Sequence, residues 1–356
     1  MVPKTVLLTG GAGFVGATLA LHLKAERPAT RVIALDNLRR RGGELNLPRL
    51  KAAGVEFVHG DVRNPEDLDL PPADLVIECS AEPSVLAGYA ASPEYVLRTN
   101  LVGTLNVLEY CRRQQAALLF LSTSRVYPLE LLRAIRLLEG PARFEIAREQ
   151  ACPGISAQGV GEAFPLTGAR SLYGATKLAS ELFIEEYREA YGIRAVINRC
   201  GVLAGPWQMG KVDQGVVVLW VARHVYGGAL SYIGFSGSGK QVRDVLHIAD
   251  LCELVALQIA QLETLDGQVL NVGGGPGTSI SLLELTDICE RVTGNRIHID
   301  RVPQDRHADV PLYISDISKI RAVTRWTPTR SIEDIVRDIF DWIRAHQTVL
   351  ASILDV

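Results

Sequence analysis

Long apolar runs, paired cysteines and an excess of charge of one sign are all missing from this chain of 356 residues. The longest uninterrupted apolar stretch, near residues 215–222, is far short of the roughly 20 residues that span a bilayer, so we expect no membrane partner. The net charge is −3, and the short basic run at 39–41 is typical of a solvated loop or a phosphate contact. We therefore expect no nucleic-acid partner.

The six cysteines are scattered without paired spacing, which indicates a reducing compartment rather than a disulfide framework. The seven histidines form no HExxH or HxH cluster, so no metal site is expected. Four glycines between residues 10 and 16 interrupt the first apolar stretch and argue against a signal peptide. These observations predict a soluble, cytoplasmic protein.

Apolar, strand-like runs alternate with helix-like stretches over the first 200 residues. This alternation predicts an α/β fold with a Rossmann-type, doubly wound parallel sheet and a smaller C-terminal substrate-binding lobe. The predicted strands are 6–8, 31–35, 56–59, 75–78, 117–122 and 194–199, and the clearest helical patterns are 98–114 and 172–191.

The chain changes character after residue 200. Residues 201–245 are rich in glycine and aromatics, which favours a loop-rich lobe. A further strand is predicted at 268–272, a capping box at Ser281 and Glu284, and an amphipathic helix near the C-terminus.

The most informative early motif places Gly10, Gly13 and Gly16 between an apolar strand and a helix-like stretch at 14–24. In such a dinucleotide-binding turn the first glycine permits the tight bend, the second lets the backbone approach a pyrophosphate, and the third allows the helix to pack closely. The strand–turn–helix context makes this glycine pattern credible.

An acidic residue, Asp36, follows twenty positions after Gly16, at the end of the second predicted strand. A carboxylate there accepts hydrogen bonds from the adenosine ribose and repels a 2′-phosphate, which favours NAD over NADP. Two alternatives stay open: the arginines at 39–41 favour NADP, and Asp36 is also suited to a turn before Asn37.

Asp61 and Val62 follow the third predicted strand, where they are placed to contact adenine, although Asp61 is equally suited to cap a helix at 64–68. Asn100 is expected either to brace the site or to be a polar residue within a helix. The further positions expected to line the cofactor are Phe14, Val15, Asn37, Ser80, Ala81, Ser122 and Cys200.

Tyr173 and Lys177 are four residues apart in the predicted helix 172–191, so their side chains share one face. A nearby ammonium lowers the pKa of a phenol from about 10 by roughly 1–3 units, which makes Tyr173 a candidate base. The hydroxyl cluster at 122–124 follows a predicted strand and is suited to bind a reacting sugar oxygen. Next to a nicotinamide, this set predicts hydride chemistry on an alcohol.

Taken together, these motifs resemble the extended short-chain dehydrogenase/reductase family, and within it the NAD-dependent nucleotide-sugar epimerases and dehydratases. The resemblance is carried by TGGAGFVG, HGDVRN at 59–64, NLVGTLNVLE at 100–109, STSRVY at 122–127, SLYGATK, GSGKQVRDVLHIADL at 237–251 and NVGGG at 271–275. It implies a Thr123–Tyr173–Lys177 catalytic triad, NAD as cofactor, a CDP- or UDP-linked sugar as substrate, and a homodimer or homotetramer.

Three stretches resemble the 2-epimerases of CDP-paratose and CDP-tyvelose in particular: DNLRRRGGELNLPRL, VDQG at 212–215 and GKQVRDVLH. Family dehydratases and decarboxylases carry an acidic residue just after the catalytic hydroxyl, where this chain has Ser124 and Arg125. This departure favours epimerisation over elimination. An asparagine usual in UDP-sugar 4-epimerases is replaced by Val202, and a common histidine by Glu78.

For the substrate, Arg243 is expected to contact the pyrophosphate, with pairing to Asp244 as the alternative. Arg306, near Asp309, is a second such candidate or an exposed loop charge. Asp213 and Gln214 are expected to line the sugar site or to form a turn.

These expectations divide the chain into an NAD-binding domain at 1–200, with 240–272 returning to it, and a substrate-binding lobe at 201–239 and 273–356. The segment 128–170 has no assigned role. A simple reductase, a dehydratase and a non-catalytic NAD(H)-sensing protein on the same fold are the rival functions.

Overall fold

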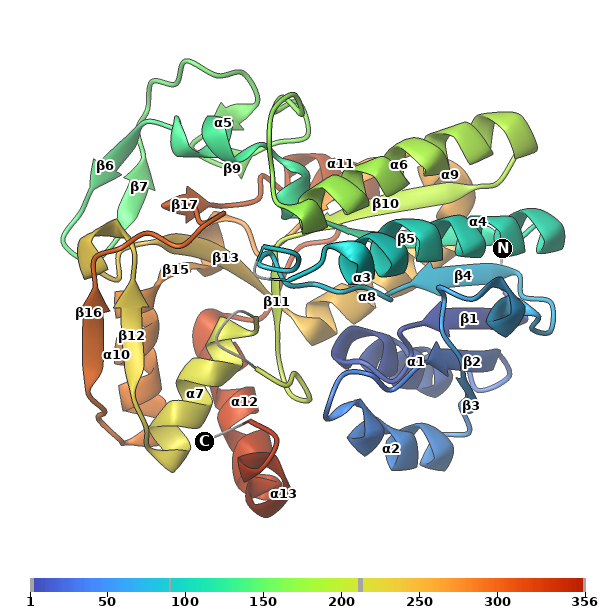
Figure 1. Cartoon of the computed structure of the whole chain (residues 1–356), viewed down its shortest axis with the longest axis horizontal. Helices are drawn as coiled ribbons and strands as arrows, with labels where there is room; N and C mark the ends of the chain where they lie inside the picture. Colours follow the sequence, from blue (N-terminus) through green and yellow to red (C-terminus); the bar gives the residue numbers. More distant parts are fainter. Residues whose placement is uncertain (1–2, 90, 211–213, 355–356) are drawn as a thin grey trace. The chain divides into compact units, whose positions relative to one another are not determined.

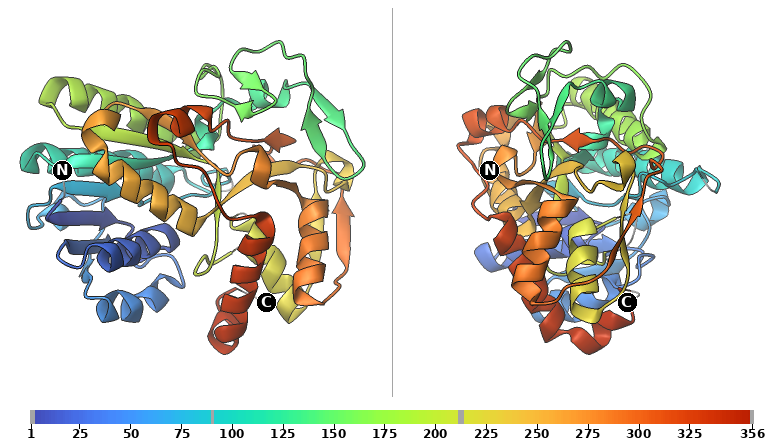
Figure 2. Two further views of the ribbon diagram at one scale, coloured as in Figure 1. Left: turned by 180° about the vertical axis from the view of Figure 1, so that it is seen from behind. Right: turned by 90° about the vertical axis from the view of Figure 1, so that its left-hand side faces the viewer.

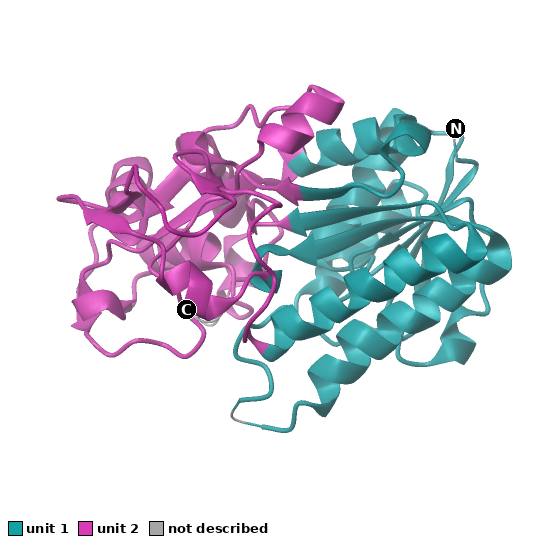
Figure 3. Cartoon of the chain, turned by 90° about the horizontal axis from the view of Figure 1, so that it is seen from above, with its two compact units in different colours: residues 1–126, 172–199, 251–270 teal, residues 127–171, 200–250, 271–356 magenta. Residues whose placement is uncertain are grey.

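In the computed structural model, residues 3–89, 91–210 and 214–354 are described. Packing divides the chain into two compact units (Figure 3). The first contains residues 1–126, 172–199 and 251–270, and the second contains residues 127–171, 200–250 and 271–356. The second unit is comparable in size to the first because residues 127–171 belong to it.

The first unit is built on a seven-stranded sheet with the order β14-β10-β5-β4-β1-β2-β3 (Figure 1). The pairs from β3 to β5 run parallel. This arrangement confirms the predicted α/β doubly wound fold, and every predicted strand is present within one residue of its expected ends. The strands are β1 (Thr5–Thr9), β2 (Arg31–Asp36), β3 (Glu56–His59), β4 (Leu75–Glu78), β5 (Ala117–Thr123), β10 (Ala195–Cys200) and β14 (Val269–Val272).

Helices cover both faces of this sheet. In Figure 1, α4 and α6 lie over one face, and α8 comes to the front when the molecule is seen from behind (Figure 2). Burial on both faces explains why the inner strands β1, β4 and β5 are nearly continuous apolar runs rather than alternating ones. The helices are α1 (Phe14–Glu26), α2 (Leu47–Ala52), α3 (Glu94–Leu97), α4 (Gly103–Gln114), α6 (Leu172–Tyr191), α8 (Ile248–Ala260) and α9 (Leu262–Leu265).

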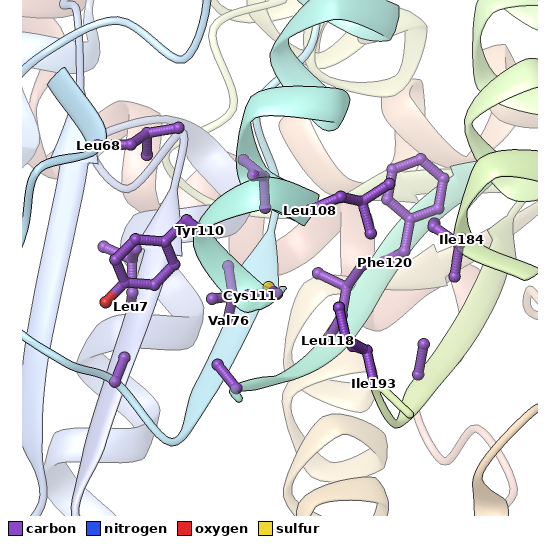
Figure 4. Packing of buried hydrophobic residues seen from close by; sticks show 14 of the residues in the cluster. Leu7, Leu68, Val76, Leu108, Tyr110, Cys111, Leu118, Phe120, Ile184 and Ile193 are labelled. Carbon is purple, nitrogen blue, oxygen red and sulfur yellow. The ribbon is translucent and has the colours of Figure 1, made fainter. Parts of the chain in front are cut away.

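The core of this unit lies between the sheet and the helices α4 and α6 (Figure 4). Leu108 of α4 and Ile184 of α6 pack with Leu118 and Phe120 of β5, and all four are fully buried. The predicted helix 98–114 is divided, because a π-helical turn at Arg98–Val102 precedes α4. Such turns are rare and occur mostly at functional sites.

Strand order reverses between β1 and β4, because β2 and β3 extend the sheet on one side and β5, β10 and β14 on the other. Ligands of doubly wound sheets bind beyond the carboxyl ends of the strands at such a reversal. The residues that follow β1 and β4 therefore lie where a dinucleotide is bound in this fold class.

The second unit contains a four-stranded sheet of β11, β13, β15 and β17, and three strand pairs: β6 with β7, β8 with β9, and β12 with β16. Its strands are β6 (Leu137–Glu139), β7 (Phe144–Ile146), β8 (Ile155–Ser156), β9 (Gly159–Val160), β11 (Val202–Ala204), β12 (Leu230–Ile233), β13 (Val242–His247), β15 (Ser279–Ser281), β16 (Ile299–Val302) and β17 (Leu312–Tyr313). Its helices are α5 (Leu129–Arg133), α7 (Val216–Tyr226), α10 (Leu282–Thr293), α11 (Ser318–Thr324), α12 (Ile332–Ala345) and α13 (Gln347–Ala351).

The expectation of a loop-rich segment at 201–245 is wrong for α7. Its valine-rich sequence favours a strand by local propensity, but the helix packs against α10 and α12 and buries most of its side chains. Gly215 and Gly227, both with positive φ, bound it. The capping box at Ser281 and Glu284 is confirmed at the start of α10.

No helix in the described ranges is both long and apolar enough to cross a membrane.

Candidate active site

The glycine turn between β1 and α1 is as tight as the sequence motif predicts. Gly10 has φ +64°, and a Cβ there would lie 2.8 Å from the backbone nitrogen of Ser80, after β4. A Cβ on Gly16 would lie 2.2 Å from the Gly10 carbonyl oxygen, whereas one on Gly13 would approach only that oxygen, at 3.2 Å. Side chains are thus excluded at Gly10 and Gly16, and the backbone at Gly13 is left open.

Gly13 is the N-cap of α1, so Phe14 and Val15 form its first turn and both are half-buried. Sequence reasoning missed Gly11, where a Cβ would lie 2.7 Å from Ala34 Cα of β2. A glycine is needed there because the turn and the neighbouring strand touch through their backbones.

Asp36 is the last residue of β2, and its carboxylate holds the turn. Oδ2 accepts a hydrogen bond from the Ala12 amide at 3.0 Å, and Oδ1 accepts one from Leu38 at 2.8 Å. The bond from Leu38 closes a turn around Asn37, as the alternative interpretation of Asp36 predicted. Burial raises the pKa of Asp36, against hydrogen bonds from Leu38, Ala12 and Gly13 that lower it. A carboxylate has about four acceptor sites, so capacity remains for ribose hydroxyls.

Asn37 and Asp61 are brought together by the adjacent strands β2 and β3. Asn37 Nδ2 donates to Asp61 Oδ2 at 2.8 Å, and Arg63 forms an ion pair with the same carboxylate at 2.6 Å. Burial opposes ionisation of Asp61, but the hydrogen bonds from Arg63 and Asn37 prevail and lower its pKa to about 2. Val62 is buried beside this pair.

Tyr95 of α3 was not found from the sequence. Its ring lies 4.1 Å from the Arg39 guanidinium and 5.0 Å from that of Arg63, both cation–π distances. Arg39 is one of the residues that kept NADP open as an alternative, and here its guanidinium lies on an aromatic ring. No local pattern signals Tyr95, because it is more than 30 residues away in the chain from both arginines.

Ser80 and Ala81 follow β4, and the Ser80 hydroxyl lies 3.0 Å from that of Thr9. Asn100, fully buried in the π-helical turn, accepts from the Glu82 amide at 2.7 Å and donates to the Glu82 carbonyl at 3.0 Å. It also donates to the Thr176 hydroxyl of α6 at 3.3 Å. Asn100 thus ties the loop after β4 to the helix that carries Tyr173.

The three residues of the predicted triad come from β5 and α6, which pack together in the first unit. Thr123 is the buried last residue of β5. Tyr173 is half-buried in the first turn of α6, and Lys177, one turn later, is only 1% exposed. The Lys177 Nζ lies 4.3 Å from the ring centre of Phe120 of β5.

Ser122, predicted to line the cofactor, is buried in β5, and its hydroxyl takes part in a side-chain cluster. It donates to Glu181 of α6, which forms a buried ion pair with Arg199 of β10 at 2.7 Å. This unpredicted cluster joins β5, α6 and β10 below the triad, and we interpret it as structural support.

Arg243 and Arg306, the predicted phosphate-binding residues, belong to the second unit. The Arg243 guanidinium donates to Asp309 Oδ1 at 2.6 Å and to the Val310 carbonyl at 2.7 Å, rather than to Asp244. Arg306 is half-buried, and its carbonyl accepts from the Asp309 amide at 3.3 Å. Asp309 thus contacts the Arg243 guanidinium through its side chain and the Arg306 carbonyl through its backbone.

The other predicted site residues, Cys200, Asp213 and Gln214, belong to residues 200–250 of the second unit. Cys200 is buried at the end of β10, and Gln214 is half-buried just before α7. Asp213 lies outside the described residues. No three His, Cys, Asp or Glu side chains within residues 3–89, 91–210 and 214–354 form a group that suits a metal ion.

The strand order and the glycine turn at its reversal are those of the Rossmann class of α/β proteins. Residues 6–273 match the model of the NAD dependent epimerase/dehydratase family. The chain belongs to this family, which confirms the resemblance found in its motifs.

Relatives with three different reactions are similar to almost the whole chain. The CDP-paratose 2-epimerase of Salmonella typhi is 31% identical, covering 95% of this chain and 98% of that protein. The UDP-glucose 4-epimerase of Thermus thermophilus, solved with NAD, is 27% identical with a TM-score of 0.76, covering 96% and 99% of the two chains. A dTDP-glucose 4,6-dehydratase from Streptomyces venezuelae, also solved with NAD, is 26% identical with a TM-score of 0.79, covering 98% and 99%.

Proposed function

We propose that this enzyme is an NAD-dependent nucleotide-sugar epimerase that oxidises a sugar carbon transiently and returns the hydride to its opposite face. The observation that carries the proposal is the set formed by Thr123 at the end of β5 and by Tyr173 and Lys177 on one face of α6. The two residues after Thr123 are Ser124 and Arg125, and neither supplies the acid that elimination requires at neutral pH.

The first unit fits NAD as cofactor. Side chains at Gly10 and Gly16 would collide with backbone atoms, so the turn can present its amides to a pyrophosphate at the start of α1. Asp36, at the end of β2, suits the ribose hydroxyls and disfavours a 2′-phosphate. NAD, when bound, accepts the hydride from the sugar carbon and gives it back.

Each residue of the triad has a distinct task in this mechanism. Tyr173, as phenolate, removes the proton of the sugar hydroxyl and later returns it. Lys177 supplies the positive charge that favours the phenolate. The Thr123 hydroxyl binds the reacting oxygen and keeps it within reach of Tyr173. The keto-sugar must then rotate to present its opposite face, while the nucleotide remains anchored.

We assign that anchoring to the second unit. Arg243 and Arg306 both belong to this unit, and a guanidinium suits bidentate phosphate binding. The overall similarity of this chain to the CDP-paratose 2-epimerase supports a CDP-linked sugar inverted at C2. The segments that contain Asp213, Gln214 and Arg243 resemble the same class of 2-epimerases. We further propose that the active enzyme is a homodimer or homotetramer.

The proposal is tested by incubating the purified chain, without added NAD, with CDP-paratose, CDP-tyvelose, UDP-glucose and dTDP-glucose, and by identifying products with proton NMR. Inversion at C2 of a CDP-sugar is expected. Inversion at C4 of UDP-glucose would favour the alternative 4-epimerase, and loss of water from dTDP-glucose the alternative dehydratase. Tyr173→Phe is expected to lower turnover by about 100-fold or more while NAD stays bound.

A further inference from the structure

Glu78, the last residue of β4, is a buried carboxyl that the proposed mechanism does not use. Glu78 is 0% exposed, and its Oε2 atom has no hydrogen-bond partner among the described residues. Burying a carboxylate without full hydrogen bonding is costly, so a residue that persists in this position needs a compensating charge or a proton.

Lys177 supplies such a charge. Glu78 pairs in register with Phe120 on the neighbouring strand β5, and the Lys177 ammonium lies over the Phe120 ring at 4.3 Å. Register partners in a parallel sheet direct their side chains to the same face, so Glu78 and the Phe120 ring under Lys177 share one face of the sheet in the interior of the first unit. Burial raises the pKa of Glu78 to about 7, and the interaction with Lys177 and the Thr104 hydrogen bond oppose that rise.

Thr104 of α4 allows Glu78 to exist with or without its proton. The Thr104 hydroxyl lies 2.7 Å from Glu78 Oε1 and 2.8 Å from the Asn100 carbonyl oxygen, but it has only one proton to donate. When it donates to Glu78, it stabilises the carboxylate. When it donates to Asn100, a protonated Glu78 can donate to Thr104 in turn.

The remaining groups around Glu78 do not compete for this role. From α4, the Cys111 thiol also faces it, and burial raises the thiol's pKa far above its ordinary value, so it stays neutral. The register partner on β1 is Thr9, whose hydroxyl is paired with that of Ser80. Lys177 of α6 is the charged group whose interaction lowers the pKa of Glu78.

We propose that Glu78 is a positioning residue of the Tyr173–Lys177 pair, a buried counter-charge that holds the Lys177 ammonium and sets the pH range over which Tyr173 ionises. The inference rests on the proposed function for the role of Tyr173, but its physical content is an electrostatic coupling between named side chains.

The coupling predicts the sign of the effect of Glu78→Gln. Removing a negative charge favours the deprotonated forms of its neighbours, so the pKa values of both Tyr173 and Lys177 fall. Because Glu78 has a pKa of about 7, its charge acts mainly above that pH, and the part of the pH profile of kcat/KM above about pH 7 is expected to move to lower pH, by about 1 unit. Glu78→Asp keeps the charge and is expected to leave the profile near its wild-type position, even if packing lowers stability.

A readout independent of turnover separates this inference from the proposed function. Tyrosine labelled with ¹³C at Cζ, with the Tyr173 signal assigned through Tyr173→Phe, reports its titration directly in the NAD-bound protein. A lower Tyr173 midpoint in Glu78→Gln, with Glu78→Asp unchanged, supports the inference even if no nucleotide sugar is turned over. An unchanged or raised midpoint in Glu78→Gln, or equal shifts in both variants, would overturn it.

Discussion

At the scale of single residues, the candidate site depends on two kinds of position. At some, there is no room for a side chain; at others, an ionisable side chain is buried. Gly16 belongs to the first kind, because its Cβ would overlap the Gly10 carbonyl oxygen at 2.2 Å. Backbone atoms cannot move aside as a flexible side chain can, so the turn itself must distort when this space is filled.

Gly16→Ala is expected to lower the free energy of unfolding by about 1–3 kcal/mol and to abolish retention of NAD during purification. Gly277→Ala is the matched control, because no atom lies within 4 Å of its added Cβ, and it should change stability by less than about 0.5 kcal/mol. Thermal melts and the NAD content of the denatured protein measure both effects. Equal behaviour of the two variants would contradict this account of the turn.

The sequence was sufficient for the residues whose role follows from local spacing. Gly10, Gly13 and Gly16, Asp36, and the pair Tyr173 and Lys177 all lie on the elements that their motifs predict. Tyr95 was missed because its arginine partners are far away in the chain. The Glu181–Arg199 ion pair was missed because no motif marks it, although the two residues are only 18 positions apart.

At the scale of elements, α6 organises the first unit and the β6–β7 hairpin shapes the second. The hairpin lies in the segment to which the sequence analysis assigned no role. Arg143, in the hairpin, donates to the Ser279 hydroxyl at 2.6 Å and pairs with Glu284 at 3.4 Å. The Phe144 amide donates to the Lys240 carbonyl at 3.0 Å, close in sequence to Arg243.

Arg143→Ala is expected to loosen this hairpin, because charge-assisted hydrogen bonds contribute about 1.5–3 kcal/mol. Amide hydrogen exchange in residues 137–146 should accelerate by about tenfold or more, while exchange in β1 and β5 stays unchanged. Arg148→Ala, at an exposed position nearby, is the control. Equal exchange in both variants would mean that other contacts hold the hairpin.

Element prediction succeeded where periodicity matched burial and failed where packing overrides propensity. Most strands of the sheet and α6 were placed correctly because the strands are apolar runs and one face of the helix is apolar. The helix α7 was missed because the glycines and aromatics of residues 201–245 indicated loops. Its helical form is stabilised by burial against α10 and α12.

At the scale of the whole molecule, each unit contains a buried carboxyl that is costly to ionise. Burial raises the pKa of Glu78 in the first unit to about 7 and that of Asp244 in the second to about 6. In the unfolded chain these groups ionise near their ordinary values. The folded state thus retains protons that the unfolded state has lost, and these two groups make stability fall as pH rises from about 4 to 7.

Glu78→Gln and Asp244→Asn each remove one such group. Between pH 4 and pH 8, the wild type is expected to lose up to about 3 kcal/mol more of its free energy of unfolding than either variant does. Glu149→Gln, at an exposed position, controls for the loss of one negative charge. Urea denaturation across this range measures the shift, and a difference that does not vary with pH would contradict the predicted burial cost.

In the proposed mechanism, a hydride leaves a sugar carbon and returns to the same carbon without exchanging with solvent. Running the reaction in heavy water and examining the inverted carbon by proton NMR tests this step. We expect a new epimer with no solvent deuterium at that carbon. Incorporation of deuterium there would contradict this mechanism, because the carbon would then have been inverted by proton abstraction rather than by hydride return.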